Sequence, residues 1–147
     1  MRLFAFALLL AATATHAQVE VDKAWARATA PGAPVAGGYM MIRNKGAAPD
    51  RLVGASSSVA AKVELHVHIK EGEIVKMRPV QGYDIPANGS FELKPGGAHL
   101  MFLQIARPFK EGDRIPVTLK FEKAGEVSVE FAVGRLGGSA PPPAHKH

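Results

Sequence analysis

Four side chains in the middle of the sequence have types and spacings that suit a soft metal ion. They are two histidines and two methionines: His66, Met77, His99 and Met101. Ten residues separate the first histidine from the first methionine, twenty-one separate that methionine from the second histidine, and one residue separates the last pair. Together they offer two imidazole nitrogens and two thioether sulfurs. Thioethers suit Cu(I) and imidazoles suit copper, whereas magnesium and calcium prefer oxygen ligands.

Each of these residues taken alone has a structural explanation, so the signal lies in their combination. A methionine in a strand most often fills a core, and a lone histidine is most often a surface or hydrogen-bonded residue. His99 and Met101 are two positions apart on a predicted strand and therefore face the same way. That pairing favours metal binding over coincidence.

The spacing His-x10-Met-x21-His-x-Met resembles the metal-binding motif of the periplasmic copper chaperone family called PCuAC. Flanking segments resemble that family as well: Trp25-Ala26-Arg27-Ala28, Met77-Arg78-Pro79-Val80 and Lys94-Pro95-Gly96-Gly97. The resemblance runs from about Val19 to Val133 and implies Cu(I) held by the four motif residues. It also implies a copper-accepting partner, either a cytochrome oxidase subunit or an assembly factor. Some relatives carry an extra methionine shortly after the first histidine, whereas this chain has His68 there, so His68 is a candidate auxiliary ligand.

The N-terminal segment has the pattern of a secretory signal peptide. A short basic start, Met1-Arg2, precedes an apolar run over 3–12, and Thr15-His16-Ala17 ends in small residues. We therefore expect a signal peptide over 1–17, cleavage before Gln18 and a periplasmic mature protein. The apolar run is shorter than the ~20 residues that a membrane span requires, so we expect no membrane insertion of the mature chain.

Composition excludes several classes of function. The chain has no cysteine, so it has neither disulfides nor the thiolate that a blue-copper electron carrier needs. Its formal charge of +5 falls by one to +4 when Arg2 leaves with the signal peptide, and basic residues are interspersed with acids. We therefore expect no nucleic-acid binding. Because no nucleophile–base constellation, phosphate loop or carboxylate pair stands out, we predict that the protein is not an enzyme.

From Gln18 onward, short apolar runs alternate with Gly, Pro and Asn, which is typical of an all-β protein. Eight or nine short strands predict one Greek-key β-sandwich domain over 18–136, and the resemblance implies a cupredoxin-like version. Residues 137–147 read GGSAPPPAHKH, which lacks packing residues and predicts a disordered tail. Its histidines, His145 and His147, are candidate donors to a weaker secondary site for Cu(II) or zinc.

Two predicted turns position the ligands. In the alternating run 62–69 both histidines fall on the face opposite the apolar residues, so we expect His66 to face outward and lie at the surface. A two-residue turn at Glu71-Gly72 would then place His66 directly opposite Met77. Before His99, Pro95 and Gly96 stand at the central positions of a type II turn.

The leading functional hypothesis is a monomeric periplasmic chaperone that binds one Cu(I) and delivers it to a cuproprotein. The alternative within the metal class is a copper or zinc storage or binding protein without a dedicated acceptor. Zinc prefers histidine and cysteine to methionine, so the two methionines discriminate between the metals. A binding or adhesion sandwich with a coincidental motif is a further alternative, and it predicts no metal affinity.

Overall fold

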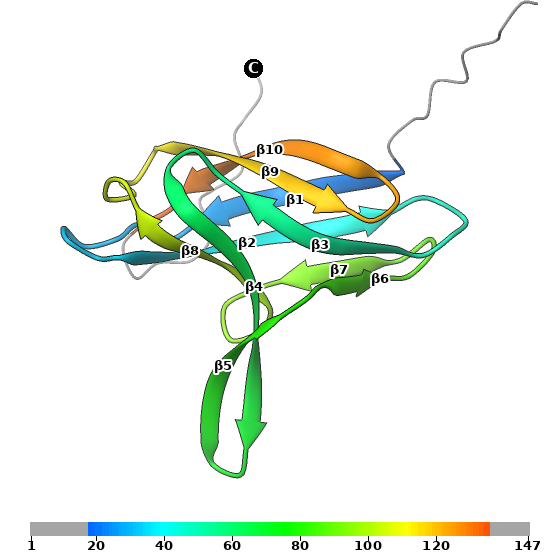
Figure 1. Ribbon diagram of the computed structural model, residues 1–147, viewed down its shortest axis with the longest axis horizontal. Helices are drawn as coiled ribbons and strands as arrows, with labels where there is room; N and C mark the ends of the chain where they lie inside the picture. The colour runs from blue at the N-terminus through cyan, green and yellow to red at the C-terminus, as the bar shows by residue number, and fades with distance from the viewer. Residues whose placement is uncertain (1–17, 136–147) are drawn as a thin grey trace, which may run out of the picture.

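The strands of the computed structural model form one hydrogen-bonded ladder that closes on itself (Figure 1). The structure describes residues 18–135. Their strands are β1 (Val19–Ala26), β2 (Val35–Asn44), β3 (Asp50–Ser56), β4 (Ala60–Glu71), β5 (Ile74–Val80), β6 (Tyr83–Ile85), β7 (Ser90–Leu93), β8 (His99–Ile105), β9 (Arg114–Phe121) and β10 (Gly125–Val133). The closed path runs β4-β8-β2-β1-β10-β9-β3 and returns to β4 through the pair Ala55–Val63. β1 pairs with β10 in parallel, and the other pairings are antiparallel.

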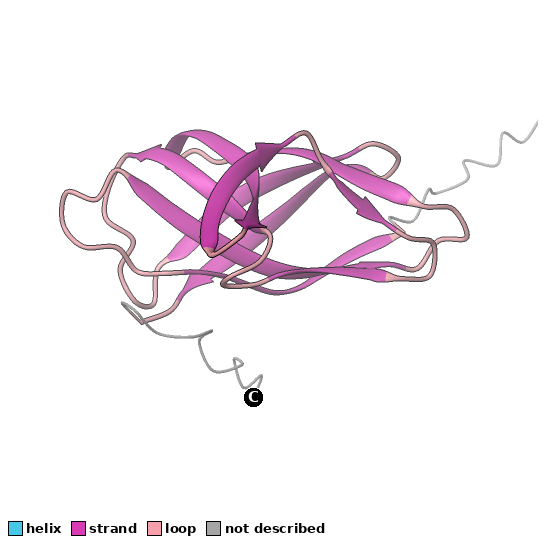
Figure 2. Cartoon of the chain, turned by 90° about the horizontal axis from the view of Figure 1, so that it is seen from below, coloured by secondary structure: helices cyan, strands magenta, loops and turns pink. Residues whose placement is uncertain are grey.

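The prediction of an all-β single domain is confirmed, but the strands form a seven-stranded mixed barrel instead of a two-sheet sandwich. The difference arises where β3 and β4 meet. β3 pairs with β9 and also with β4. These pairings join the two sheets that a sandwich would keep separate. The remaining strands are additions, because β6 pairs with β3, β7 pairs with β2 and β5 pairs with β4. Figure 2 shows the strands from below, surrounding the interior.

Alternating apolar residues fill the barrel. On β8, Leu100 and Phe102 are completely buried, and Phe102 makes edge contacts with Phe109 and Phe131 at ring-centroid distances of 5.4 Å and 6.2 Å. Burying side chains of this size contributes about 1.5–3 kcal/mol each. Because side chains alternate along a strand, this packing holds β8 with His99 and Met101 on its opposite face.

The second half of β4 leaves the barrel and pairs with β5 to form a projecting hairpin (Figure 1). β5 is an edge strand, and its apolar residues Ile74, Val75 and Met77 are exposed. The hairpin thus extends from the site that the sequence predicts. Among the described residues, no helix is long and apolar enough to cross a membrane. The predicted signal peptide (1–17) and tail (137–147), with His145 and His147, lie outside the described residues.

Candidate metal centre

The pairing of β4 with β8 brings the two motif histidines together. His66 lies directly opposite His99, and Glu64 lies opposite Met101. The ring centroids of His66 and His99 are 5.5 Å apart. Residues two apart on a strand share a face, and opposed residues share it too. Three of the four predicted ligands therefore lie on one surface of two adjacent strands.

The turn before β8 has the predicted geometry. The amide of Gly97 donates to the carbonyl of Lys94 at 2.9 Å, and Gly96 has a φ of +81°. Pro95 and Gly96 thus occupy the central positions of a type II turn. This turn lies against the histidines, because the Gly97 carbonyl accepts hydrogen bonds from two of them.

The predicted register of the β4–β5 hairpin is wrong by two residues. Glu71 pairs with Ile74, so the turn residues are Gly72 and Glu73, and Met77 lies opposite His68 instead of His66. Gly72 has a φ of +63°, which suits glycine at the first central position of a II′ hairpin turn. The pattern Gly-X is the sequence signal for this turn. Because the shift is an even number of residues, Met77 stays on the face that carries both histidines.

Hydrogen bonds fix which nitrogen of each imidazole carries the proton. The Gly97 carbonyl accepts from Nδ1 of His68 at 3.0 Å and from Nδ1 of His99 at 3.1 Å. The Glu64 carboxylate accepts from Nε2 of His66 at 2.8 Å. A carbonyl or carboxylate oxygen can only accept, so in each neutral ring the other nitrogen has a free lone pair.

Two of those free nitrogens are buried. Nδ1 of His66 and Nε2 of His99 are shielded from solvent and have no hydrogen-bond partner within the described part of the chain. The side chain of His66 is only 12% exposed, and His99 is 3% exposed. The expectation that His66 lies free at the surface is therefore wrong, because strand pairing with β8 covers the ring. An unpaired buried polar group costs about 1–3 kcal/mol, and a soft metal ion would satisfy both nitrogens.

The surroundings shift the pKa values of His99 and Glu64. Burial lowers the pKa of His99 below the usual histidine value, and the neighbouring His68 and His66 lower it further, against the opposing effect of the Gly97 carbonyl. Hydrogen bonds from His66 and then Lys62 lower the pKa of Glu64. At neutral pH His99 is therefore uncharged, and Glu64 is an anion that accepts from His66.

Tyr83 joins the two histidine-bearing strands and has no signature in the sequence. Its hydroxyl oxygen lies 2.6 Å from the carbonyl oxygen of His66 and 2.9 Å from that of His99, so its single hydrogen is shared between them. Its ring stacks on Phe91 with centroids 4.8 Å apart. Burial raises the pKa of this phenol, which stays a hydrogen-bond donor. Tyr83 thus ties the backbones of β4 and β8 together at the two histidines.

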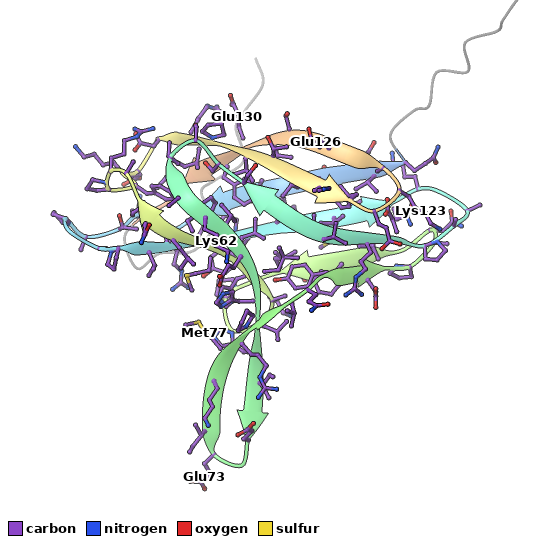
Figure 3. The ribbon with its side chains drawn as sticks, viewed as in Figure 1. Lys62, Glu73, Met77, Lys123, Glu126 and Glu130 are labelled. Carbon is purple, nitrogen blue, oxygen red and sulfur yellow. The ribbon has the colours of Figure 1, made fainter. Side chains whose placement is uncertain are left out.

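An open pocket of about 320 Å³ lies over this face. Its lining includes Met77, His99 and Met101, together with His68 and Arg27. Met77 is 54% exposed at the root of the hairpin, where Figure 3 labels it. The structure therefore gathers His99 and both methionines around the pocket. His66 is not among the lining residues and lies directly opposite His99 in the pairing of β4 with β8.

Charges of both signs lie near the pocket. Arg27 lines it, lies over the ring of Tyr39 at 5.7 Å and forms no ion pair with a described residue, whereas the anionic Glu64 lies opposite Met101 on the neighbouring strand. Over residues 18–135, no cluster of three or more His, Cys, Asp or Glu side chains is arranged to hold a metal ion.

Comparison with known proteins supports a common family. Residues 19–133 match the family model LpqE-like, described as “Putative lipoprotein LpqE-like”. A curated relative, “Putative lipoprotein Lxx21020” of Leifsonia xyli subsp. xyli, is 34% identical over 122 residues, which are 82% of this chain and 72% of the relative.

Solved structures give the same result at the level of the fold. The copper-bound PCuAC domain from PmoF2 superimposes with a TM-score of 0.69 at 29% identity, covering 80% of this chain and 93% of that domain. The apo PCuAC domain from PmoF1 also gives 0.69, at 30% identity and coverages of 80% and 94%. The CuI form of DR1885 from Deinococcus radiodurans gives 0.63 at 30% identity, with coverages of 78% and 76%. The chain therefore belongs to the LpqE-like family and has a PCuAC domain.

Proposed function

We propose that this protein binds one Cu(I) ion through His66, Met77, His99 and Met101. The observation that carries the proposal is the pair of buried imidazole nitrogens, Nδ1 of His66 and Nε2 of His99, that have no hydrogen-bond partner within residues 18–135. All four donors are uncharged, and thioethers favour Cu(I) over harder cations. The copper-bound PmoF2 domain and the CuI form of DR1885, both similar to this chain, support copper as the metal.

The proposed role is that of a chaperone, which holds copper and then releases it to an acceptor. Uncharged thioethers bind Cu(I) without the deep energy well of thiolates, so a competing ligand can displace them. Met77 is 54% exposed on the projecting hairpin, where an acceptor can reach it. We propose a copper site of cytochrome c oxidase, or a factor that assembles it, as the acceptor, following the resemblance of the motif to the PCuAC family.

We further propose that the protein acts outside the cytoplasm, in the periplasm, as a monomer without enzymatic activity of its own. The lipoprotein descriptions of its family and of its Leifsonia relative support an extracytoplasmic location. The N-terminal pattern of a signal peptide supports export. The neutral donor set and the open pocket suit holding and exchanging an ion.

An anaerobic competition titration tests the proposed metal binding. The mature chain from Gln18 is titrated with Cu(I) against a colorimetric chelator, and we expect one equivalent to bind. Replacing both Met77 and Met101 with Leu should abolish this binding, whereas Met41→Leu, the same change outside the pocket, should not alter it. Failure of the wild type to compete for Cu(I), or full affinity in the double variant, would contradict the proposal.

A transfer assay separates a chaperone from a storage protein that binds the same ion. The Cu(I)-loaded protein is mixed with a soluble copper-accepting domain of cytochrome oxidase, and the metal content of each protein is measured after separation. We expect copper to move to the acceptor within the mixing experiment. Retention of copper in the presence of excess acceptor would favour storage.

A further inference from the structure

His68 is the donor that the motif omits, and the hairpin register gives it a distinct place. It lies directly opposite Met77, whereas His66 lies opposite Pro79 on β5 and opposite His99 on β8. His68 and Met77 line the same pocket as His99 and Met101. Its ring centroid is 5.1 Å from that of His99. A potential imidazole–thioether pair thus stands at the base of the hairpin, beside the inner residues of the site.

The same acceptor prepares His68 and His99 for metal binding. Each donates its Nδ1 hydrogen to the Gly97 carbonyl, at 3.0 Å and 3.1 Å, so each neutral ring has its lone pair on Nε2. Nε2 of His99 is buried, but His68 is only half-buried at the pocket. The two rings therefore present the same donor atom at two depths.

To bind the buried nitrogens of His66 and His99, Cu(I) must first exchange the ligands of the molecule that delivers it. An ion that changes hosts by ligand exchange needs a donor at each intermediate position, so that one bond forms as another breaks. Exchange among imidazole nitrogens and thioether sulfurs changes neither the charge nor the oxidation state of Cu(I), because every donor is neutral. The pair His68–Met77 offers such a position between solvent and His99.

We propose that His68 is a transit ligand, which binds Cu(I) together with Met77 during loading and release but leaves it when copper settles on His66, His99 and Met101. The proposal rests on the proposed function, because it concerns the path of the same ion. Along this path Met77 remains bound to copper, while Nε2 of His99 replaces Nε2 of His68 as a ligand during loading and the reverse exchange occurs during release. The incoming carrier or the acceptor protein then exchanges ligands with copper at the base of the hairpin, not inside the ladder.

A transit ligand changes rates without changing equilibrium affinity, and this signature differs from that of a resident ligand. The variant His68→Gln removes the imidazole nitrogen whose lone pair would bind copper and keeps a polar side chain. We expect its Cu(I) dissociation constant to stay within about twofold of the wild type. We expect stopped-flow loading from a chelator, and release to it, both to slow by about tenfold or more, because an equilibrium constant is the ratio of the two rates.

Two further variants separate transit from structural damage. His68→Met supplies a thioether in place of the imidazole and should restore most of the lost rate. The control is Lys70→Gln, two residues further along the same face of β4. The charged Lys70 side chain has no lone pair that could bind copper, so its replacement should leave both rates unchanged.

Three outcomes would overturn the proposal. Unchanged rates in His68→Gln would show that copper does not pass by this residue. A weakened affinity with faster release would make His68 a resident ligand. Failure of His68→Met to recover any rate would assign the effect to the lost Gly97 hydrogen bond. If the wild type bound no Cu(I), the proposed function itself would fail, which the equilibrium titration reveals before any rate is measured.

Discussion

Each motif imidazole has one nitrogen engaged by an oxygen acceptor and one nitrogen left bare. For His66 the acceptor is Glu64, two residues earlier on the same strand face, and for His99 it is the carbonyl of Gly97. The spacing of the sequence identifies the candidate donors, because residue type and strand parity are local properties. It does not identify which nitrogen of His99 is left without a hydrogen bond, or the role of Tyr83, since these depend on how β4, β8 and the turn before β8 meet.

Removing the charge of Glu64 should weaken Cu(I) binding. In Glu64→Gln the hydrogen bond to His66 loses its charge assistance, and the amide can instead donate to Nε2, which would move the ring proton to the metal-facing Nδ1. Groups that orient metal-binding histidines typically affect metal affinity by about 10–100-fold, and we expect a loss in this range by competition titration.

The matched control for this change is Glu71→Gln, at the other end of β4. Glu71 makes exposed ion pairs with Lys76 and Arg78, and such surface pairs contribute little. We expect this variant to bind like the wild type. Equal affinities in the two variants would remove Glu64 from the account.

Tyr83→Phe should affect stability and metal binding together. The substitution keeps the ring stacked on Phe91 but leaves the carbonyls of His66 and His99 without their shared donor. A lost buried hydrogen bond of this kind costs about 1–3 kcal/mol of unfolding free energy, measurable by urea denaturation of the apo protein, and Cu(I) affinity should fall with it.

Tyr39→Phe is the comparison for Tyr83→Phe, because the Tyr39 hydroxyl makes no hydrogen bond with the described residues while its ring packs on Trp25. Its unfolding free energy should stay close to that of the wild type. If Tyr83→Phe behaved in the same way, the hydroxyl would not be what ties β4 to β8.

Among the elements, the β4–β5 hairpin governs the position of Met77. Strand positions here could be predicted from alternation and turn residues, as could the type II turn that precedes β8. The register could not be fixed by alternation alone, because shifts of two residues leave every side chain on its own face. The choice between them depends on whether Gly72 takes the first or second central position of the turn. A positive φ suits glycine at either position, and the pairing of Glu71 with Ile74 shows that Gly72 takes the first.

Parity of the hairpin can be tested by insertion within β5. One alanine inserted between Val75 and Lys76 should turn Met77 to the opposite face and remove one sulfur from the proposed copper site. We expect Cu(I) affinity to fall by about tenfold or more in the competition titration.

Two alanines at the same point restore parity and serve as the control, because Met77 then lies opposite His66 on the original face. This variant should bind more tightly than the single insertion. The reverse order of affinities would show that hairpin register does not position the sulfur.

At the scale of the whole molecule, the strands close into a barrel in which β4 and β8 are neighbours and carry His66 and His99 on one face. Ten strands with apolar alternation are compatible with a sandwich or a barrel, so the sequence predicts the class but not the closure. Closure depends on the contact between Ala55 of β3 and Val63 of β4, which alternation in either strand does not encode. The pairing of β4 with β8 sets His66 beside His99, and His66, which alternation predicted to lie at the surface, is only 12% exposed.

The buried His99 makes the stability of the apo protein sensitive to acid. Because its pKa is lowered in the fold, the unfolded chain binds more protons once the pH falls through the unperturbed value of about 6.5. The unfolding free energy of the apo protein should therefore decrease as the pH falls from about 6.5 toward the lowered pKa of His99. Urea denaturation at several pH values measures this decrease.

The assignment of this effect to His99 needs a residue-specific measurement. In an NMR titration of the apo protein, the imidazole of His99 should protonate below the usual histidine range, and protons should compete with Cu(I) for it only there. Titration of His99 at or above about 6.5 would contradict the structural account of its burial.

The most direct test of the proposed site is X-ray absorption at the copper edge of the Cu(I)-loaded mature protein under anaerobic conditions. We expect two sulfur and two nitrogen neighbours, from Met77, Met101, His66 and His99, and the loss of both sulfurs when the two methionines are replaced by leucine. A first shell of nitrogen and oxygen alone in the wild-type protein would contradict this expectation.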